Sequence, residues 1–197
     1  MTDYIQAMDK DQVIARIAEH YESIIRLLGD DPSRHGLEKT PVRAAKALYY
    51  ATQGYRENAD DIMKSAIFEY AGSQMVIVKD IEFYSFCEHH ILPFFGRVSV
   101  GYIPDGEMIG LSKLARVVNV YARRLQVQER LTAEICACIS RSLHTKGVIV
   151  ACNAQHLCMK MRGVEKQDSS TTTIEYNGLF SAPDMRAEFF SLIRDIN

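Results

Sequence analysis

The stretch Phe86-Cys87-Glu88-His89-His90 constrains this chain most, because it places potential metal ligands within a very short span. Cys87 and His90 are three residues apart, a spacing that lets both side chains reach one metal ion from a tight turn. Two ligands do not complete a zinc site, so the rest of the chain must supply more. The fold is therefore expected to bring further ligands to this turn.

A second pair of potential ligands, His156 and Cys158, lies much further along the chain. The pair falls in an apolar, β-branched run from Val148 to Met159, which favours a strand. Residues two apart on a strand share one face, so both side chains are expected to point towards one site. Cys87, His90 and Cys158 then form a thiolate-rich ligand set, which suits zinc better than magnesium or calcium.

Plainer interpretations compete with a catalytic zinc site. A single Cys-x-x-His occurs by chance, and cysteine is often a small buried apolar residue. A structural zinc site would fill all four positions with protein ligands. Against this, five potential ligands are expected to converge: Cys87, His89, His90, His156 and Cys158. Because a catalytic site keeps three protein ligands and one open position, two histidines would remain for proton transfer.

The bulk composition narrows the class of protein. The 197 residues allow one substantial domain, or a domain with an arm. The net charge of −2 gives no reason to expect nucleic-acid binding. No apolar run is long enough to span a membrane, and the N-terminus lacks the basic and apolar regions of a signal peptide. Five cysteines, two of them placed as ligands, fit a reducing compartment, so we expect a cytoplasmic protein.

Apolar periodicity predicts an α+β order of elements. Helices are expected over 13–28, from Thr40 onward, weakly over 60–70, over 112–125, over 131–139 and from Pro183 onward. Strands are expected over 75–83, 96–103, 148–159 and 171–176. We expect Thr40 and Ser112 to be helix N-caps. This order is typical of an antiparallel sheet with helices on one face, and its open edges favour pairing between subunits.

Polar residues outside the ligand pairs indicate a nucleotide site. Lys113 and Arg116 lie at a predicted helix N-terminus, where backbone amides and the helix dipole favour anions. Arg162 adds a third cation near the ligands, although the chain has no Gly-x-x-x-x-Gly-Lys loop. The amide of Gln128 and the carboxylate of Glu129 suit the edge of a purine. Before any resemblance is considered, local capping and pairing at a helix start is the favoured explanation of these two residues.

Several motifs, in this order along the chain, resemble those of the GTP cyclohydrolase I family. They are Cys87-Glu88-His89-His90, Gly110-Leu111-Ser112-Lys113, Gln128-Glu129-Arg130-Leu131-Thr132, His156-x-Cys158 and Met161-Arg162-Gly163. The run Thr40-Pro41-Val42-Arg43-Ala44-Ala45-Lys46 is similar to the N-terminal helix motif of the same family. The resemblance extends from about residue 37 to about residue 180, and residues 1–36 carry little of it.

The resemblance implies a fold and an assembly. The fold is a T-fold (tunnelling fold), an α+β arrangement whose antiparallel four-stranded sheet has two helices between strands 2 and 3. N-terminal helices and a C-terminal helix complete it. We expect an N-terminal helical region over 1–73 and a T-fold catalytic domain over 74–197. The implied assembly is a homodecamer of two stacked pentamers with active sites between subunits, and no regulatory partner is indicated.

The resemblance also implies an activity. The family converts GTP and water to 7,8-dihydroneopterin triphosphate and formate, the first step of folate or tetrahydrobiopterin biosynthesis. Zinc is implied at Cys87, His90 and Cys158. The other implied roles are proton transfer by His89 and His156, assistance to a later sugar rearrangement by Ser112, triphosphate binding by Lys113, Arg116, Arg162, Arg43 and Lys46, and guanine binding by Gln128 and Glu129. The chemistry agrees, because zinc activates water and histidine exchanges protons near neutral pH.

Two alternatives remain open. A T-fold relative that acts on a 7-deazaguanine base through a cysteine nucleophile needs neither zinc nor triphosphate-binding cations. The metal content of the purified protein distinguishes this alternative from a zinc-dependent GTP cyclohydrolase. A zinc-stabilised binding module without enzymatic activity would have four ligands, and removal of zinc would unfold it rather than only stop turnover.

Overall fold

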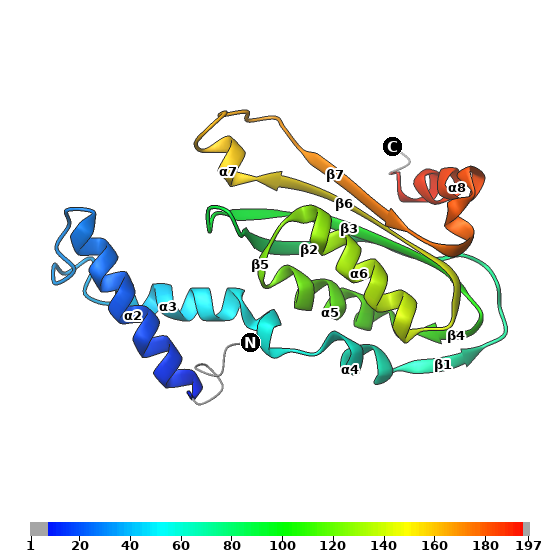
Figure 1. Ribbon diagram of the computed structural model, residues 1–197, viewed down its shortest axis with the longest axis horizontal. Coiled ribbons are helices and arrows are strands. Elements are labelled where there is room, and N and C mark those ends of the chain that lie inside the picture. Colours follow the sequence, from blue (N-terminus) through cyan, green and yellow to red (C-terminus); the bar gives the residue numbers. More distant parts are fainter. Residues whose placement is uncertain (1–7, 195–197) are drawn as a thin grey trace. The chain divides into compact units, whose positions relative to one another are not determined.

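The computed structural model describes residues 8–194 (Figure 1). It consists of two compact units, one within residues 1–52 and one within residues 53–197. The expected catalytic-domain boundary after residue 73 stays a prediction. No helix among residues 8–194 is both long and apolar enough to cross a membrane.

The N-terminal unit contains two helices, α2 (Lys10–Leu27) and α3 (Thr40–Ala51). Asp9 caps α2 by accepting from the Gln12 backbone N–H, while the Gln12 side chain accepts from the Asp9 N–H. Gly29 then turns the chain at a φ of +87°, which glycine adopts without a Cβ clash. The helix expected over 13–28 is thus confirmed.

The buried core of this unit is smaller than the apolar stripe of α2 predicts. Ile14, Ala18 and Ala45 are buried, whereas Leu28 is 80% exposed. The expectation that Thr40 caps α3 is wrong, because Lys39 is the cap and Thr40 is the first helical residue. Pro41 does lie in the first turn, where its missing N–H breaks no helical hydrogen bond.

The second unit is built on a five-stranded sheet in the order β5-β2-β3-β6-β7 (Figure 1). Its strands are β2 (Val76–Cys87), β3 (Pro93–Pro104), β5 (Leu125–Gln126), β6 (Thr145–His156) and β7 (Thr171–Tyr176). The four long strands are antiparallel, as expected. The four-stranded description needs one correction, because β5 adds a fifth strand parallel to the end of β2. A strand of two residues carries no periodicity that a sequence could reveal.

A small second sheet joins β1 (Ile67–Tyr70) to β4 (Gly106–Ile109). The weak helix expected over 60–70 is therefore wrong in its second half. The helix α4 (Ala59–Lys64) ends early, and β1 follows because its backbone pairs with β4. A short 3-10 turn, Gln53–Arg56, precedes α4.

Helices cover both faces of the five-stranded sheet, not one face as expected. The helices α5 (Leu111–Ala122) and α6 (Gln128–Ser142) pack on one face (Figure 1). On the other face, α8 (Pro183–Ile193) and the 3-10 turn Gly178–Ser181 bury Phe180 and Phe189 against Ile149 and Ala151 of β6. Both faces of β6 are apolar from Val148 to Ala151, so helices must shield each face from water.

A β-bulge in β2 determines which face Cys87 occupies. The pairing of β2 with β3 shifts between Val78 and Ile81, and Asp80 within the shift has a φ of +59°. Because side chains alternate along a strand, one extra residue moves every later side chain to the opposite face. Ile81, Phe83 and Cys87 consequently join the core that faces α5 and α6, to which Val78 also contributes.

Replacing Asp80 tests this bulge. A left-handed backbone costs about 1–2 kcal/mol for most residues, and aspartate and asparagine tolerate it best after glycine. We expect Asp80→Val to lower the free energy of unfolding by about 1–2 kcal/mol. Asp80→Asn is the control, since it removes only an exposed contact to Arg97 at 3.7 Å. Denaturant unfolding of both variants measures the difference, and equal stabilities would show that the strand relaxes to a regular ladder.

Candidate metal centre and active site

The connection between β2 and β3 is a tight turn that presents Cys87 and His90. The backbone N–H groups of His90 and Ile91 donate to the Cys87 carbonyl at 3.3 and 2.8 Å, and the Cys87 N–H donates to the Leu92 carbonyl at 2.9 Å. Ile91 has a φ of +52°, a strained value for a β-branched residue. The turn brings Nδ1 of His90 to 3.8 Å from the Cys87 sulfur.

Cys158 completes a group of three potential ligands with Cys87 and His90. The ligand atoms of the three residues all lie within 4.8 Å of one another. This spacing fits one ion, because bonds of about 2.0–2.3 Å to a tetrahedral zinc place its ligand atoms roughly 3.3–3.8 Å apart. Burial, together with the neighbouring thiol of Cys87, raises the pKa of Cys158. A cation between the two sulfurs would favour the thiolate forms, so the donor set fits zinc.

Cys158 reaches this group by a route that the sequence did not predict. The strand β6 ends at His156, and Cys158 belongs to the short helix α7 (Leu157–Lys160). The expectation that His156 and Cys158 share one strand face is therefore wrong. The helical turn between them separates their directions, and His156 is not a member of the three-ligand group.

His89 and His90 both approach Cys87, so closeness to that sulfur does not separate their roles. Nδ1 of His89 lies 3.9 Å from the Cys87 sulfur, and the two imidazole rings are 6.2 Å apart at 81°. What distinguishes them is Cys158, because the group that includes Cys158 contains His90 and not His89. The His89 side chain is 64% exposed, which leaves it accessible to a substrate.

An ion pair that the sequence analysis missed ties this turn to α6. Arg130 pairs with the Glu88 carboxylate, and its hydrogen bond lowers the pKa of Glu88. Nε of Arg130 also donates to Oε1 of Gln126 at 2.8 Å, and Gln126 donates to Glu134 at 2.7 Å. Glu88 and Arg130 both stand in recognisable motifs, but no spacing rule pairs residues so far apart in sequence.

His156 lies at the end of β6, held on two sides. Its Nε2 is 2.8 Å from Oε1 of Gln128, and its ring stacks on Phe94 with centroids 4.7 Å apart and planes 2° from parallel. Phe94 is its direct partner across the β3–β6 ladder. Burial lowers the pKa of His156, and the nearby Glu129 carboxylate partly opposes this effect. Glu129 itself is exposed in the first turn of α6.

Of the predicted phosphate-binding cations in this unit, Arg162 is brought to the three-ligand group. Its Nη1 lies 3.4 Å from Nε2 of His90. One end of the sheet thus collects the potential zinc ligands, the two remaining histidines, Glu129 and one arginine. A potential metal site with imidazoles beside it provides the groups that metal-assisted hydrolysis uses, an activated water and proton donors or acceptors.

Ser112, Lys113 and Arg116 lie elsewhere in the same unit. Ser112 and Lys113 stand in the first turn of α5, whose N-cap is Gly110 and not Ser112 as expected. Gly110 donates to the Ala66 carbonyl beside β1 and β4. The opposite end of α5 leads into β5, which pairs with Cys87 (Figure 1). Twelve helical residues span about 18 Å, so this first turn lies far from the metal ligands.

Arg43 and Lys46 belong to the N-terminal unit. Both are exposed and three residues apart on α3, the arrangement that the sequence indicated. Their part in a nucleotide site stays a prediction.

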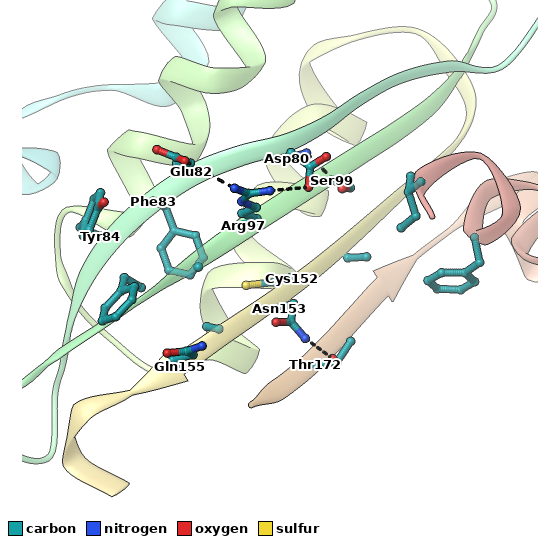
Figure 2. Close-up of a pocket in the computed structure, with 16 residues that line it drawn as sticks. Asp80, Glu82, Phe83, Tyr84, Arg97, Ser99, Cys152, Asn153, Gln155 and Thr172 are labelled. Carbon is teal, nitrogen blue, oxygen red and sulfur yellow. Dashed lines mark hydrogen bonds and ion pairs between the residues drawn. The ribbon is translucent and has the colours of Figure 1, made fainter. Parts of the chain in front are cut away.

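A separate cavity of about 540 Å³ opens on the face of the sheet that α8 shares (Figure 2). Arg97 lies between Asp80 and Glu82 there, and Asn153 donates to Thr172. None of the five potential ligands lines this cavity. The candidate site is therefore the open end of the sheet and not this cavity.

The family model and the sequence relatives agree with the motifs. The family described as GTP cyclohydrolase I matches residues 17–194. A protein named GTP cyclohydrolase 1 from Porphyromonas gingivalis is 55% identical over 186 residues, which cover 94% of this chain and 96% of that protein. The protein of the same name from Rattus norvegicus is 50% identical over 187 residues, covering 94% of this chain and 78% of that protein. Among solved structures, the archaeosine synthase QueF-Like in the apo form has a TM-score of 0.46 at 18% identity, covering 55% of this chain and 97% of that chain.

Proposed function

We propose that this chain, which belongs to the GTP cyclohydrolase I family, is a zinc-dependent enzyme that converts GTP and water to 7,8-dihydroneopterin triphosphate and formate. The observation that carries the proposal is the group formed by Cys87, His90 and Cys158. It lies at the same end of the sheet as His156 and Glu129. In this proposal the enzyme is cytoplasmic and begins folate or tetrahydrobiopterin biosynthesis.

The chain's own residues divide the chemistry between them. Zinc, when bound by Cys87, His90 and Cys158, supplies Lewis-acid activation of water for attack on C8 of the purine. His89 is exposed beside the ligands and delivers a proton to a ring nitrogen as a C–N bond breaks. Burial lowers the pKa of His156, which favours the neutral imidazole, the form that accepts a proton. Ser112, in the first turn of α5, assists the later rearrangement of the sugar, and a second copy would have to bring it to the metal ligands.

The position of α5 supports a site shared between subunits. A bound GTP needs its base near Glu129 and its triphosphate near cations, but Lys113 and Arg116 lie on α5, whose first turn is at the other end of the unit. A second copy, with its α5 beside the first copy's metal ligands, would supply these two cations.

The edge of the sheet supports the same assembly. Among the described strands β7 pairs only with β6, and a strand from a neighbouring subunit would cover its free edge. We therefore propose a T-fold homodecamer of two pentamers, in which Arg43 and Lys46 also contribute to triphosphate binding. Light scattering on the purified protein measures the number of subunits. A well-behaved active monomer would contradict a shared site.

The activity is tested by incubating the purified protein with GTP while measuring formate release, product fluorescence after oxidation and zinc content. The proposal expects turnover that depends on zinc. Turnover of a 7-deazaguanine base without zinc would favour the cysteine-nucleophile alternative. Unfolding on zinc removal, without any GTP turnover, would favour the binding module.

Glu129 is proposed to distinguish guanine from adenine. Guanine presents two adjacent donors, N1–H and the 2-amino group, and a carboxylate accepts both through charge-assisted hydrogen bonds. We expect Glu129→Gln to keep zinc and assembly and to weaken GTP binding by about 1.5–3 kcal/mol, the worth of a hydrogen bond to a charged group. The side-chain amide of Gln128 is buried, so Glu129 carries the side-chain contact to the base.

Equilibrium binding of GTP and ATP to the purified variant measures this effect. Glu188→Gln is the matched control, because Glu188 is exposed on α8, which packs on the opposite face of the sheet. If Glu129→Gln binds GTP as the unmodified protein does and still rejects ATP, the base is recognised by another group.

A further inference from the structure

The side-chain amide of Gln128 is buried and forms its hydrogen bonds within the protein. Gln128 is 1% exposed at the start of α6. Its Nε2 lies 3.1 Å from the Cys152 carbonyl and 2.9 Å from the Thr171 carbonyl. Backbone carbonyls only accept hydrogen bonds, so the amide nitrogen must face them. The opposite orientation would place three oxygens together in a buried site, where unpaired acceptors are costly.

A chain of hydroxyl groups supports the same amide orientation. The Thr132 hydroxyl donates to the Gln128 backbone carbonyl at 2.8 Å and lies 2.6 Å from the Thr173 hydroxyl. Thr173 must therefore donate to Thr132, which leaves the Thr173 oxygen to accept from Nε2 of Gln128 at 3.2 Å. Every donor in this cluster then has an acceptor, and Oε1 of Gln128 is left to face His156.

This orientation determines the protonation pattern of His156. Its Nε2 lies 2.8 Å from Oε1 of Gln128, and an amide oxygen only accepts. Nε2 of His156 must therefore carry a hydrogen. In the neutral ring the other nitrogen, Nδ1, then carries none and is a proton acceptor. The parallel stack on the buried ring of Phe94 restricts tilting of the imidazole about this hydrogen bond.

We infer that Gln128 is a positioning residue, which holds His156 as the Nε2–H tautomer so that Nδ1 is the ring atom that exchanges protons with the substrate. The second clause rests on the proposed function, whereas the tautomer is a property of the protein alone. Gln128 thus acts on the substrate through His156, and its side-chain amide makes no hydrogen bond to the purine.

The first test measures the tautomer in the unaltered, zinc-loaded protein. The chain has six histidines, which are labelled with 15N and compared with a His156→Asn sample to identify the His156 signals. Solid-state NMR at alkaline pH, where the ring is neutral, shows which nitrogen carries the hydrogen. Protonation at Nε2 is expected, and protonation at Nδ1 would overturn the inference.

The second test separates positioning from base reading. Gln128→Met keeps a similar side-chain volume but offers no acceptor to His156. We expect kcat for GTP to fall roughly 10²-fold, the effect of a misplaced reacting group, with KM and zinc content unchanged. The His156 signals should also show both neutral tautomers. A raised KM with kcat intact would mean that the amide binds the base, and would overturn the inference.

Thr173→Val is the matched control. It removes one acceptor around the same amide but leaves the two carbonyls that orient it and the contact to His156. Its kcat and its His156 tautomer should equal those of the unaltered protein. A loss of kcat as large as that of Gln128→Met would assign the effect to packing and overturn the inference. If Gln128→Met does not fold, the NMR spectrum of the unaltered protein still decides the tautomer of His156. If the unaltered protein releases no formate from GTP, the proposed function fails, but the tautomer measurement remains valid.

Discussion

Cys87→Ser and Cys158→Ser proteins should each contain far less than one zinc ion per chain and release no formate from GTP. Each substitution removes one sulfur from a group of three ligand atoms that lie within 4.8 Å of one another. A serine hydroxyl is a poor replacement, because a zinc site with thiolates depends on their softness and charge. Two remaining protein ligands would hold the ion too weakly to survive purification.

Zinc content by atomic absorption and formate release are measured on the same samples. Cys136→Ala is the matched control, because Cys136 is buried in α6 outside the ligand group, and burial raises the pKa of its thiol to about 11. That variant should keep its zinc at a modest cost in stability. Full zinc occupancy in both serine variants would show that the ligand set is wrong. Loss of helical circular dichroism together with zinc would indicate a structural role for the ion.

We expect His89→Ala to lower the reaction rate and His90→Ala to lower the zinc content. His89→Ala should keep zinc and lower the rate roughly 10²–10⁴-fold, the usual contribution of a general acid or base. His90→Ala should lose zinc, because His90 belongs to the ligand group with Cys158. Distance to Cys87 does not predict this difference, because Nδ1 of His89 lies 3.9 Å and Nδ1 of His90 lies 3.8 Å from the same sulfur.

Zinc content and single-turnover rates of both variants separate ligand from proton donor. His144→Ala is the control, because the His144 side chain is 83% exposed and contacts Glu107 of β4, away from the ligand group. It should match the unaltered protein in both measurements. Zinc loss in His89→Ala with retention in His90→Ala would exchange the two assignments.

The sequence by itself determined the features that depend on neighbours along the chain. β-Branched runs and, in one strand, alternation predicted the four long strands, and helical periodicity predicted the buried face of α6, where Leu131, Ile135 and Ile139 are fully buried. These patterns follow from local geometry, which repeats every two residues on a strand and every 3.6 on a helix. The pair Cys87 and His90 was equally visible, because the two residues share a single turn.

The tertiary structure decided which of these residues meet. The bulge at Asp80 changes the face of Cys87, and the start of α7 turns Cys158 away from His156. Neither feature has a periodicity, because each is a single departure from a regular ladder. One residue of shift is enough to move a ligand across the sheet, so the sequence pattern alone does not assemble the site.

The partners of Gln128 and Lys113 show the same limit. Both stand at helix starts with polar neighbours, and the sequence indicated a substrate role for each. In the structure the amide of Gln128 is satisfied by β6, β7 and His156, whereas the first turn of α5 lies at the far end of the unit. The sequence determines the chemistry of each side chain. Its hydrogen-bond partners depend on distances between segments that lie far apart in the chain, and the packing of the helices on the sheet sets those distances.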